Sequence, residues 1–251
     1  MIDFSAMKLG KQAAVHDPRT LRLADYVTNA LKPPPRIDWS TKVTNLGMML
    51  NDSLGDCTIA AAGHMIQTWT ANNGSQIVLP DSAILQGYET FCGYNPSDPS
   101  TDQGGVEVTV LNGLRKVGLG GHKIYAYVAQ EPGSRAHIEL SVDLLGGCYL
   151  GVELPRSAQN QRVWSVPPGG PHGDGAPGSW GGHAIPAVAY GPAGITVITW
   201  GQLLTMTWKF FTTYCTEAYG VLSQDWANGA KTAPSGFDFA QLQADLAAIT
   251  A

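Results

Sequence analysis

The order in which helix and strand patterns occur constrains the fold of this chain most. Helix-forming runs start near Asp56 and Asp81, and a third covers 106–117. After Gly120, short apolar runs separated by turn residues take over, and these are typical of successive strands. A helical half followed by a sheet half predicts an α+β fold.

The second half of the chain is patterned clearly enough to place single elements. We expect strands over 123–130 and 148–155, a short helix over 135–145, and consecutive strands within 183–214. The intervening segment 167–182 is rich in glycine and proline, so it is expected to be an irregular surface loop.

The chain divides into four segments on these patterns. KPPPR stiffens the backbone just before the patterned region begins, so what precedes it is set apart from the core. The expected segments are an N-terminal arm or pro-like extension at 1–35, a helical lobe at 36–120, a β lobe at 121–230 and a C-terminal helix at 231–251.

Charge and apolar content limit the partners that the chain is expected to have. It carries 15 Lys and Arg against 20 Asp and Glu, for a net charge of −5, so nothing favours nucleic acid or an anionic membrane surface. No stretch has the length of a membrane span, and the first residues lack the apolar core of a secretory signal. We therefore expect a cytoplasmic protein without nucleic-acid or membrane partners, and the oligomeric state stays open.

Cysteine and histidine spacing argues against a disulfide scaffold or a metal site. The four cysteines, at positions 57, 92, 148 and 215, form no CxxC pair and are widely scattered. No two histidines have the i, i+4 spacing of a helix-borne metal site, and the glycine-rich loop lacks a phosphate-loop pattern. We expect free thiols in a reducing compartment, no metal and no cofactor.

One of these cysteines has the position of a nucleophile. Cys57 follows a Gly-Asp turn and opens a helix-forming run, so it would lie at a helix N-terminus. Free amides and the helix dipole favour a thiolate there by about 1 kcal/mol, although the charge of Asp56 opposes this unless capping absorbs it. Position alone also fits a small buried apolar residue, and both alternatives stay open at this point.

A base for this thiol would come from the second half of the chain. His183 begins an expected strand directly after SWGG, so it would face a cleft from a strand edge. His64 lies two turns further along the helix of Cys57, about 10 Å away, which is too far to take the thiol proton. We therefore expect His183 to be the base and His64 to be a core or interface residue.

Several segments together resemble the papain-like cysteine peptidases, over about 34–226. PPRIDWSTKV is similar to the start of that family's mature domain, with Trp39 placed 18 residues before Cys57. NDSLGDCTIAAA resembles the family's nucleophile stretch, and GGHAIPAVAYGPAGITVITWG resembles the strand that bears its catalytic histidine. The resemblance implies a papain-like two-lobed fold with a helical first half, an antiparallel, barrel-like second half and an active-site cleft between them.

The resemblance also implies roles for particular residues. Asn51, six residues before Cys57, stands where the family places its oxyanion-hole glutamine. DQGG resembles the segment whose backbone pairs with an extended peptide substrate, which nominates Gly104 and Gly105 as substrate-binding residues. Cys57 and His183 would then be the catalytic pair.

The third catalytic position departs from the family pattern. The family's Asn-Ser-Trp-Gly becomes Ile198-Thr199-Trp200-Gly201. Spacing from His183 places Thr199 at the Asn position, whereas alignment on Trp-Gly places Ile198 there. The hydroxyl of Thr199 could accept a hydrogen bond from the imidazole, and Trp200 is expected to shield the histidine beside the substrate.

The resemblance implies a thiol-dependent hydrolase that cleaves peptide or amide bonds through an acyl-enzyme. Two alternatives stay open. One is a papain-fold binding or structural protein of a bacterial or phage assembly, which would permit a virion-associated location. The other keeps the acyl-enzyme chemistry and transfers the acyl group to an amine, or cleaves a peptidoglycan amide.

Overall fold

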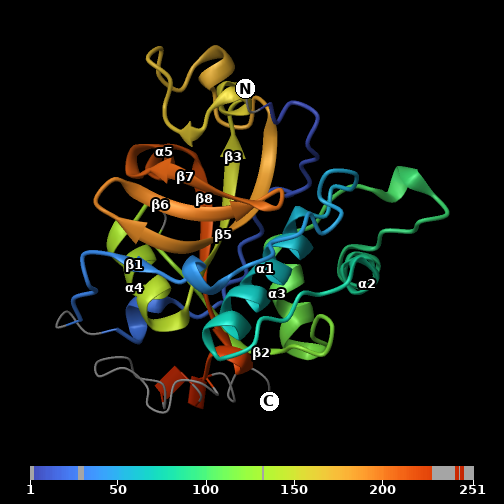
Figure 1. The fold of residues 1–251 in the computed structure, drawn as a ribbon, viewed down its shortest axis with the longest axis vertical. Helices are drawn as coiled ribbons and strands as arrows, with labels where there is room; N and C mark the ends of the chain where they lie inside the picture. Colours follow the sequence, from blue (N-terminus) through green and yellow to red (C-terminus); the bar gives the residue numbers. More distant parts are fainter. Residues whose placement is uncertain (1–2, 28–30, 132, 228–240, 243, 246–251) are drawn as a thin grey trace.

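The computed structural model describes residues 3–27, 31–131, 133–227, 241–242 and 244–245 and builds helices and strands around one sheet (Figure 1). The helices are α1 (Cys57–Asn72), α2 (Asp81–Cys92), α3 (Glu107–Lys116), α4 (Arg135–Leu145), α5 (Trp208–Tyr214) and α6 (Gln224–Ala227). The strands are β1 (Ile37–Asp38), β2 (Ile124–Ala129), β3 (Cys148–Leu154), β4 (Val163–Trp164), β5 (Gly181–Gly191), β6 (Gly194–Thr199), β7 (Gln202–Thr207) and β8 (Cys215–Ser223).

The sheet runs in the order β2-β8-β3-β5-β6-β7-β4, with β1 paired to β5. Every pairing is antiparallel except that of β4 with β7, which is parallel. Figure 1 shows α1, α2 and α3 gathered beside the strands, whereas α4 and α5 come from the part of the chain that builds the sheet. The expected α+β fold with a helical first half and a largely antiparallel second half is confirmed.

Helix α1 is buried along nearly its whole length because small side chains let neighbouring elements approach it. Its first turns are rich in alanine, and a Cβ added at Gly63 would lie 2.5 Å from Sδ of Met49. The helix begins at Cys57, as expected, and ends at Asn72. This buried helix holds its N-terminal residue rigidly against the sheet.

The aromatic run after β7 was expected to be a strand, and this prediction is wrong. Trp208–Tyr214 forms α5, which starts where the hydroxyl of Thr207 accepts a hydrogen bond from the N–H of Phe210 (3.1 Å). The helix buries Phe210, Phe211 and Tyr214, a spacing that fits one helical face better than alternate strand positions. The next strand, β8, was not anticipated, although it lies between β2 and β3.

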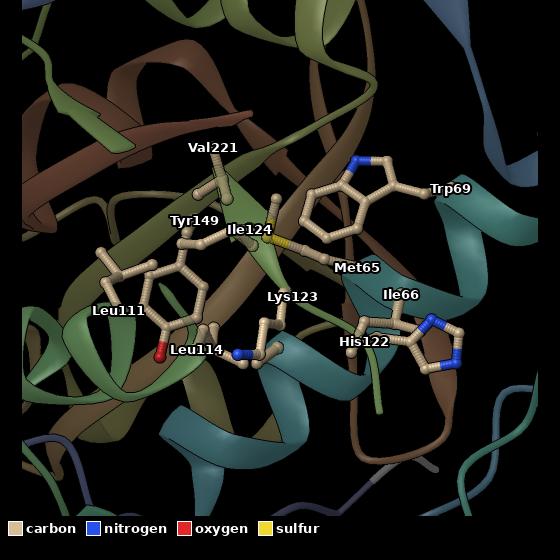
Figure 2. Close-up of a pocket in the computed structure, with 11 residues that line it drawn as sticks. Met65, Ile66, Trp69, Leu111, Leu114, His122, Lys123, Ile124, Tyr149 and Val221 are labelled. Atoms are coloured by element: carbon tan, nitrogen blue, oxygen red, sulfur yellow. The ribbon is translucent and has the colours of Figure 1, made fainter. Parts of the chain in front are cut away.

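Apolar side chains from the helices and the sheet form the core between them. Figure 2 shows Met65 and Trp69 of α1, Leu111 of α3 and Val221 of β8 around a small apolar pocket. Tyr149 of β3 reaches into the same region, where its hydroxyl donates to the carbonyl of Thr58 (2.6 Å). This contact ties the first turn of α1 to the middle of the sheet.

The N-terminal segment packs onto the rest of the fold. Phe4, Leu23 and Tyr26 are each no more than 3% exposed. Phe4 packs against Trp200, with ring centroids 5.0 Å apart. Figure 1 shows the start of the chain beside the strands, from where it descends toward α1.

Most of the expected C-terminal helix lies outside the described residues. Residues 241–242 and 244–245 are helical, Leu242 is buried, and the hydroxyl of Tyr26 donates to Asp245 (2.8 Å). Among the residues that the structure describes, no helix combines the length and apolar character needed to cross a membrane.

Candidate active site

The cysteine at the start of α1 lies against the strand that carries His183. Cys57 is fully buried, and its Sγ accepts a hydrogen bond from the N–H of Ala184 on β5 (3.4 Å). Because Ala184 directly follows His183, this bond places the thiol beside the expected base. The thiol of Cys57 therefore bonds to the backbone of the residue that directly follows His183.

The His183 ring is held by two contacts. Its Nε2 lies 2.7 Å from Oγ1 of Thr199, and its face stacks on Trp200 with ring centroids 4.4 Å apart and planes 14° apart. The other nitrogen, Nδ1, is buried without a hydrogen-bond partner among the described residues. A ring that donates Nε2–H to Thr199 leaves Nδ1 with a free lone pair, as a general base requires.

The two candidates for the third position differ in their contacts with His183. Thr199 ends β6 and contacts the imidazole, whereas Ile198 pairs with Leu203 of β7 and is buried. After Thr199 the backbone turns sharply, because Trp200 and Gly201 have φ of 45° and 69°. This turn brings the Trp200 indole against the imidazole, as expected.

Asn51 lies before α1, but its side chain is engaged elsewhere. Its Nδ2 donates to Oδ1 of Asp56 (3.1 Å) and to the carbonyl of Leu54 (3.3 Å). Both amide hydrogens are thus used within the turn that precedes Cys57, so in this arrangement the side chain has no N–H left for an oxyanion. The amide instead shapes the turn that delivers Cys57 to the helix N-terminus.

Asp56 does not cap α1 with its side chain, contrary to expectation. In the described part of the chain, its Oδ1 takes the bond from Asn51 and its Oδ2 has no partner. Burial raises the pKa of Asp56 to about 8, so the carboxyl is protonated near neutral pH. The negative charge that would have opposed a thiolate at Cys57 is therefore absent at neutral pH.

Residues of the N-terminal segment cross the site as an extended strand. Lys11 N–H donates to the carbonyl of Gly182 (3.1 Å), and Gln12 N–H donates to the carbonyl of Gly105 (2.9 Å). Gly105 N–H donates back to the carbonyl of Gly10 (2.8 Å). The backbone of Gly105 thus pairs with the chain's own N-terminal segment.

The crossing segment fits the site closely around Gly10. Its backbone N–H donates a hydrogen bond to Sγ of Cys57. A Cβ at Gly10 would lie 1.7 Å from the carbonyl oxygen of Gly55, and one at Gly104 would lie 1.8 Å from that of Gly10. Only glycine at both positions lets the two backbones come this close.

A carboxylate holds the glycine loop in place. Asp102 accepts bonds from the hydroxyl of Tyr88 (2.6 Å) and from the N–H of Gly55 (2.9 Å). The Tyr88 hydroxyl accepts in turn from the N–H of Gly104 (2.8 Å). The first residue of DQGG therefore ties the loop to the turn before Cys57.

Burial keeps the thiol and the imidazole neutral while the N-terminal segment is seated. It raises the pKa of Cys57 to about 12 and lowers the pKa of His183 to about 3. We expected the helix N-terminus to lower the thiol pKa, and in this state the desolvation of a fully buried sulfur outweighs that effect. His64 is a buried core residue, as expected, with Nδ1 2.9 Å from Oε1 of Gln67.

A second cluster near the thiol was not anticipated from the sequence. Nζ of Lys11 forms ion pairs with Glu217 (3.0 Å) and Glu153 (3.2 Å), and the Lys11 side chain is fully buried. Glu107, at the start of α3, is also buried beside them. These residues come from the N-terminal segment, α3, β3 and β8, and the only sequence signal was the presence of single charges within otherwise apolar strand patterns.

Comparison with solved structures shows which proteins share this fold. Xylellain, a cysteine protease from Xylella fastidiosa, aligns with a TM-score of 0.68 at 13% identity, over 86% of this chain and 96% of that one. Procathepsin L 3 from Tenebrio molitor larval midgut has a TM-score of 0.60 at 12% identity, covering 85% and 75%. Procathepsin B S9 from Trypanosoma congolense has 0.59 at 10% identity, covering 86% and 87%.

These likenesses show that the chain has the papain-like cysteine protease fold. The sequence itself matches no protein-family model and no curated protein. The resemblance first noticed in separate motifs therefore extends to the three-dimensional arrangement.

Proposed function

We propose that this protein is a thiol-dependent hydrolase that cleaves peptide or amide bonds. The observation that carries the proposal is that Cys57, at the start of a buried helix, bonds to the N–H of Ala184, directly after a histidine whose Nε2 is held by Thr199 and whose Nδ1 has no partner among the described residues. A nucleophile, a base and an orienting group in this order form the arrangement used for acyl transfer. The extended backbone pairing at Gly105 and Gly182 supports a peptide as the substrate.

In the proposed reaction, the thiol proton of Cys57 moves to Nδ1 of His183. The thiolate attacks the substrate carbonyl carbon, and the resulting oxyanion lies at the N-terminus of α1, where the backbone N–H of Cys57 can donate to it. Collapse breaks the C–N bond, and the imidazolium gives its proton to the leaving amine. A water molecule, deprotonated by His183, then releases the acid and restores the thiol.

The N-terminal segment must leave the site for this reaction. While Gly10 lies on the thiol, no substrate carbonyl can reach Cys57, and burial holds the catalytic pair neutral. The seated state is thus the inactive form in this proposal, and displacement of residues 8–12 produces the active one.

Thiol labelling tests the proposal directly. With the segment displaced by the Gly10→Ala change, iodoacetamide should label Cys57 faster than Cys148, and the His183→Ala change should slow this labelling. Peptide cleavage should disappear in Cys57→Ala. Labelling of Cys57 no faster than that of Cys148, or unchanged by His183→Ala, contradicts the proposal.

A binding protein with the same fold is the second candidate. It is favoured by one observation, namely that the site holds the chain's own segment and a neutral thiol. Peptide binding without turnover in the Gly10→Ala protein would select it. Product analysis with added amines or peptidoglycan fragments separates hydrolysis of peptides from acyl transfer and from amidase activity.

A further inference from the structure

The Lys11 side chain fills a pocket that is lined by carboxyl groups. We call this the acidic pocket and define it by Glu107, Glu153, Glu217 and Gly151. Nζ of Lys11 lies 3.0 Å from Oε1 of Glu217 and 3.2 Å from Oε1 of Glu153, and it donates to the carbonyl of Gln12 (3.1 Å). The Lys11 ammonium group therefore has two carboxylate partners and one carbonyl acceptor.

The pocket has room for a long side chain because its wall includes a glycine. A Cβ at Gly151 of β3 would lie 2.3 Å from Cε of Lys11 and 2.8 Å from Oε1 of Glu107. An ordinary side chain at this position would block the path of the Lys11 stem. Gly151 thus gives the pocket its depth, and Glu217 and Glu153 give it its charge.

The pocket offers more hydrogen-bonding groups than its single lysine satisfies. Both carboxyl oxygens of Glu107 are buried without a hydrogen-bond partner among the described residues. Burial raises the pKa of Glu107, whereas Lys11 has a raised pKa because Glu217 and Glu107 outweigh its own desolvation. A buried carboxyl group without a partner is costly unless a ligand with several donors pairs with it.

The acidic pocket belongs to the peptide-binding site. Lys11 is the residue next to Gly10, which lies on the Cys57 thiol, and its backbone pairs with Gly182 at the step before His183. Any extended peptide that replaces residues 10–12 along Gly105 and Gly182 therefore brings a side chain to the same pocket.

We infer that the acidic pocket selects substrates with a lysine or arginine side chain close to the bond that is cleaved. This inference rests on the proposed function and names the substrate class of that site. Residues 8–12 then occupy the site as an imitation of such a substrate, with Lys11 in place of the substrate cation. The backbone N–H of Gly10 at Sγ, where a substrate would place a carbonyl, explains why the segment can bind there without being cleaved.

The test uses the Gly10→Ala protein and peptides that carry a fluorogenic coumarin amide at the bond to be cleaved. Each of the three positions before the coumarin is occupied in turn by lysine, arginine, norleucine or glutamate. Norleucine has the length of lysine without its charge. Lysine or arginine at one position should raise kcat/KM over norleucine by roughly tenfold to a hundredfold, because paired charges in a buried site discriminate by about this much. Glutamate at that position should be rejected.

Two variants assign the preference to the pocket. In the Gly10→Ala background, Glu217→Gln should lower the ratio of lysine to norleucine peptides by about tenfold. Glu139→Gln, the same change on α4 where Glu139 pairs with Arg135, is the matched control and should leave the ratio unchanged. If Gly10→Ala does not fold by circular dichroism, Lys11→Gln opens the pocket in the full chain without added bulk.

A binding measurement separates this inference from the proposed function. Anisotropy of fluorescein-labelled lysine and norleucine peptides is measured on the Cys57→Ala, Gly10→Ala protein, which needs no turnover. Selective binding without cleavage by the active-cysteine protein supports the pocket and overturns the hydrolase. Cleavage with equal kcat/KM for lysine and norleucine overturns the pocket and supports the hydrolase, and the absence of both binding and cleavage overturns both.

Discussion

Two side chains fix the His183 ring, and they act on different parts of it. The hydroxyl of Thr199 holds Nε2 at 2.7 Å, and the Trp200 indole covers one face at a centroid distance of 4.4 Å. A hydroxyl can accept the Nε2–H bond and so select the tautomer with a free Nδ1. The third position is thus filled by a short side chain that works because β6 ends directly at the ring.

Removing that hydroxyl should impair the reaction without changing the fold. Thr199→Val keeps the β-branched shape and removes the hydrogen-bond acceptor. We expect kcat/KM to fall by about tenfold to a hundredfold, because a hydrogen bond to a charged partner contributes roughly 1.5 to 3 kcal/mol. Thr199→Asn restores an acceptor and should recover part of the rate. Full activity in Thr199→Val, measured in the Gly10→Ala background, would show that the bond does not orient His183.

Asp56 predicts how the stability of the protein depends on pH. Its pKa is raised by burial to about 8, against about 3.9 for an aspartate in an unfolded chain. Between these values the folded protein holds a proton that the unfolded chain has lost, so the stabilising contribution is complete below about pH 4 and falls as pH rises toward 8. The slope from this one group is at most about 1.4 kcal/mol per pH unit.

Asp56→Asn removes the titration and keeps an acceptor for Asn51. The variant should therefore gain stability relative to the parent as pH rises from 5 to 8, measured by urea unfolding at each pH. The comparison between variant and parent isolates Asp56, because Glu107 titrates in both proteins. A difference in unfolding free energy that stays constant over this range contradicts the assignment of the proton to Asp56.

At the scale of elements, the N-terminal segment shields the thiol at the start of α1 from solvent. Gly10 is seated because it has no side chain, and a Cβ there would meet the Gly55 carbonyl oxygen at 1.7 Å. Gly10→Ala should therefore displace the segment and raise the iodoacetamide labelling rate of Cys57 at pH 7.5 by about tenfold or more, because an exposed helix N-terminal thiol regains its thiolate. The rate is measured by mass spectrometry of the labelled peptides.

Gly169→Ala is the control for this experiment. Nothing lies within 4 Å of a Cβ at Gly169, so the same change there should leave the labelling rate unchanged. Equal labelling of the parent and Gly10→Ala proteins would show that the segment does not protect the thiol.

The elements that the sequence predicted are those with a local signal. The helix 135–145 follows from its apolar spacing and is found at Arg135–Leu145, and α1 follows from its small residues and the turn before it. The run Trp208–Tyr214 looked like a strand because aromatic residues favour strands, yet Thr207 caps a helix there and tertiary packing decides. Local propensity does not determine whether so short an aromatic segment forms a helix or a strand.

The residues of the candidate site likewise fall into those that a local motif predicts and those that only long-range contacts reveal. Cys57, His183, Thr199 and Gly105 were predicted because each lies in a recognisable motif, and the structure places Cys57 beside the strand of His183 and Thr199 beside the His183 ring. Lys11 and its carboxyl partners were not found because their contacts join positions as far apart as 11 and 217. The residue pattern of the N-terminal segment carries no signal of where that segment lies on the fold.

At the scale of the whole molecule, the N-terminal segment contributes to two of the apolar clusters that pack against the sheet. Phe4 packs in the core around Trp200, residues 8–12 cross the site, and Leu23 and Tyr26 pack with Leu144 and Leu242. The carbonyl of Lys8 also accepts a bond from Nε1 of Trp200 (3.3 Å). The segment is therefore anchored on both sides of the active site, so its release should be coupled to the stability of the domain.

A core substitution at the start of the segment tests this coupling. Phe4 is 3% exposed and packs against Trp200 with the two rings tilted. Phe4→Ala should therefore lower the unfolding free energy by about 3 kcal/mol, and Tm by roughly 2 to 4 °C for each kcal/mol. It should also raise the labelling rate of Cys57, because the same segment covers the thiol. Val15→Ala, at a residue 53% exposed in the same segment, is the control and should change neither quantity. A lower Tm by calorimetry with labelling at the parent rate would show that the anchor and the cover act independently, and the expected coupling would then be wrong.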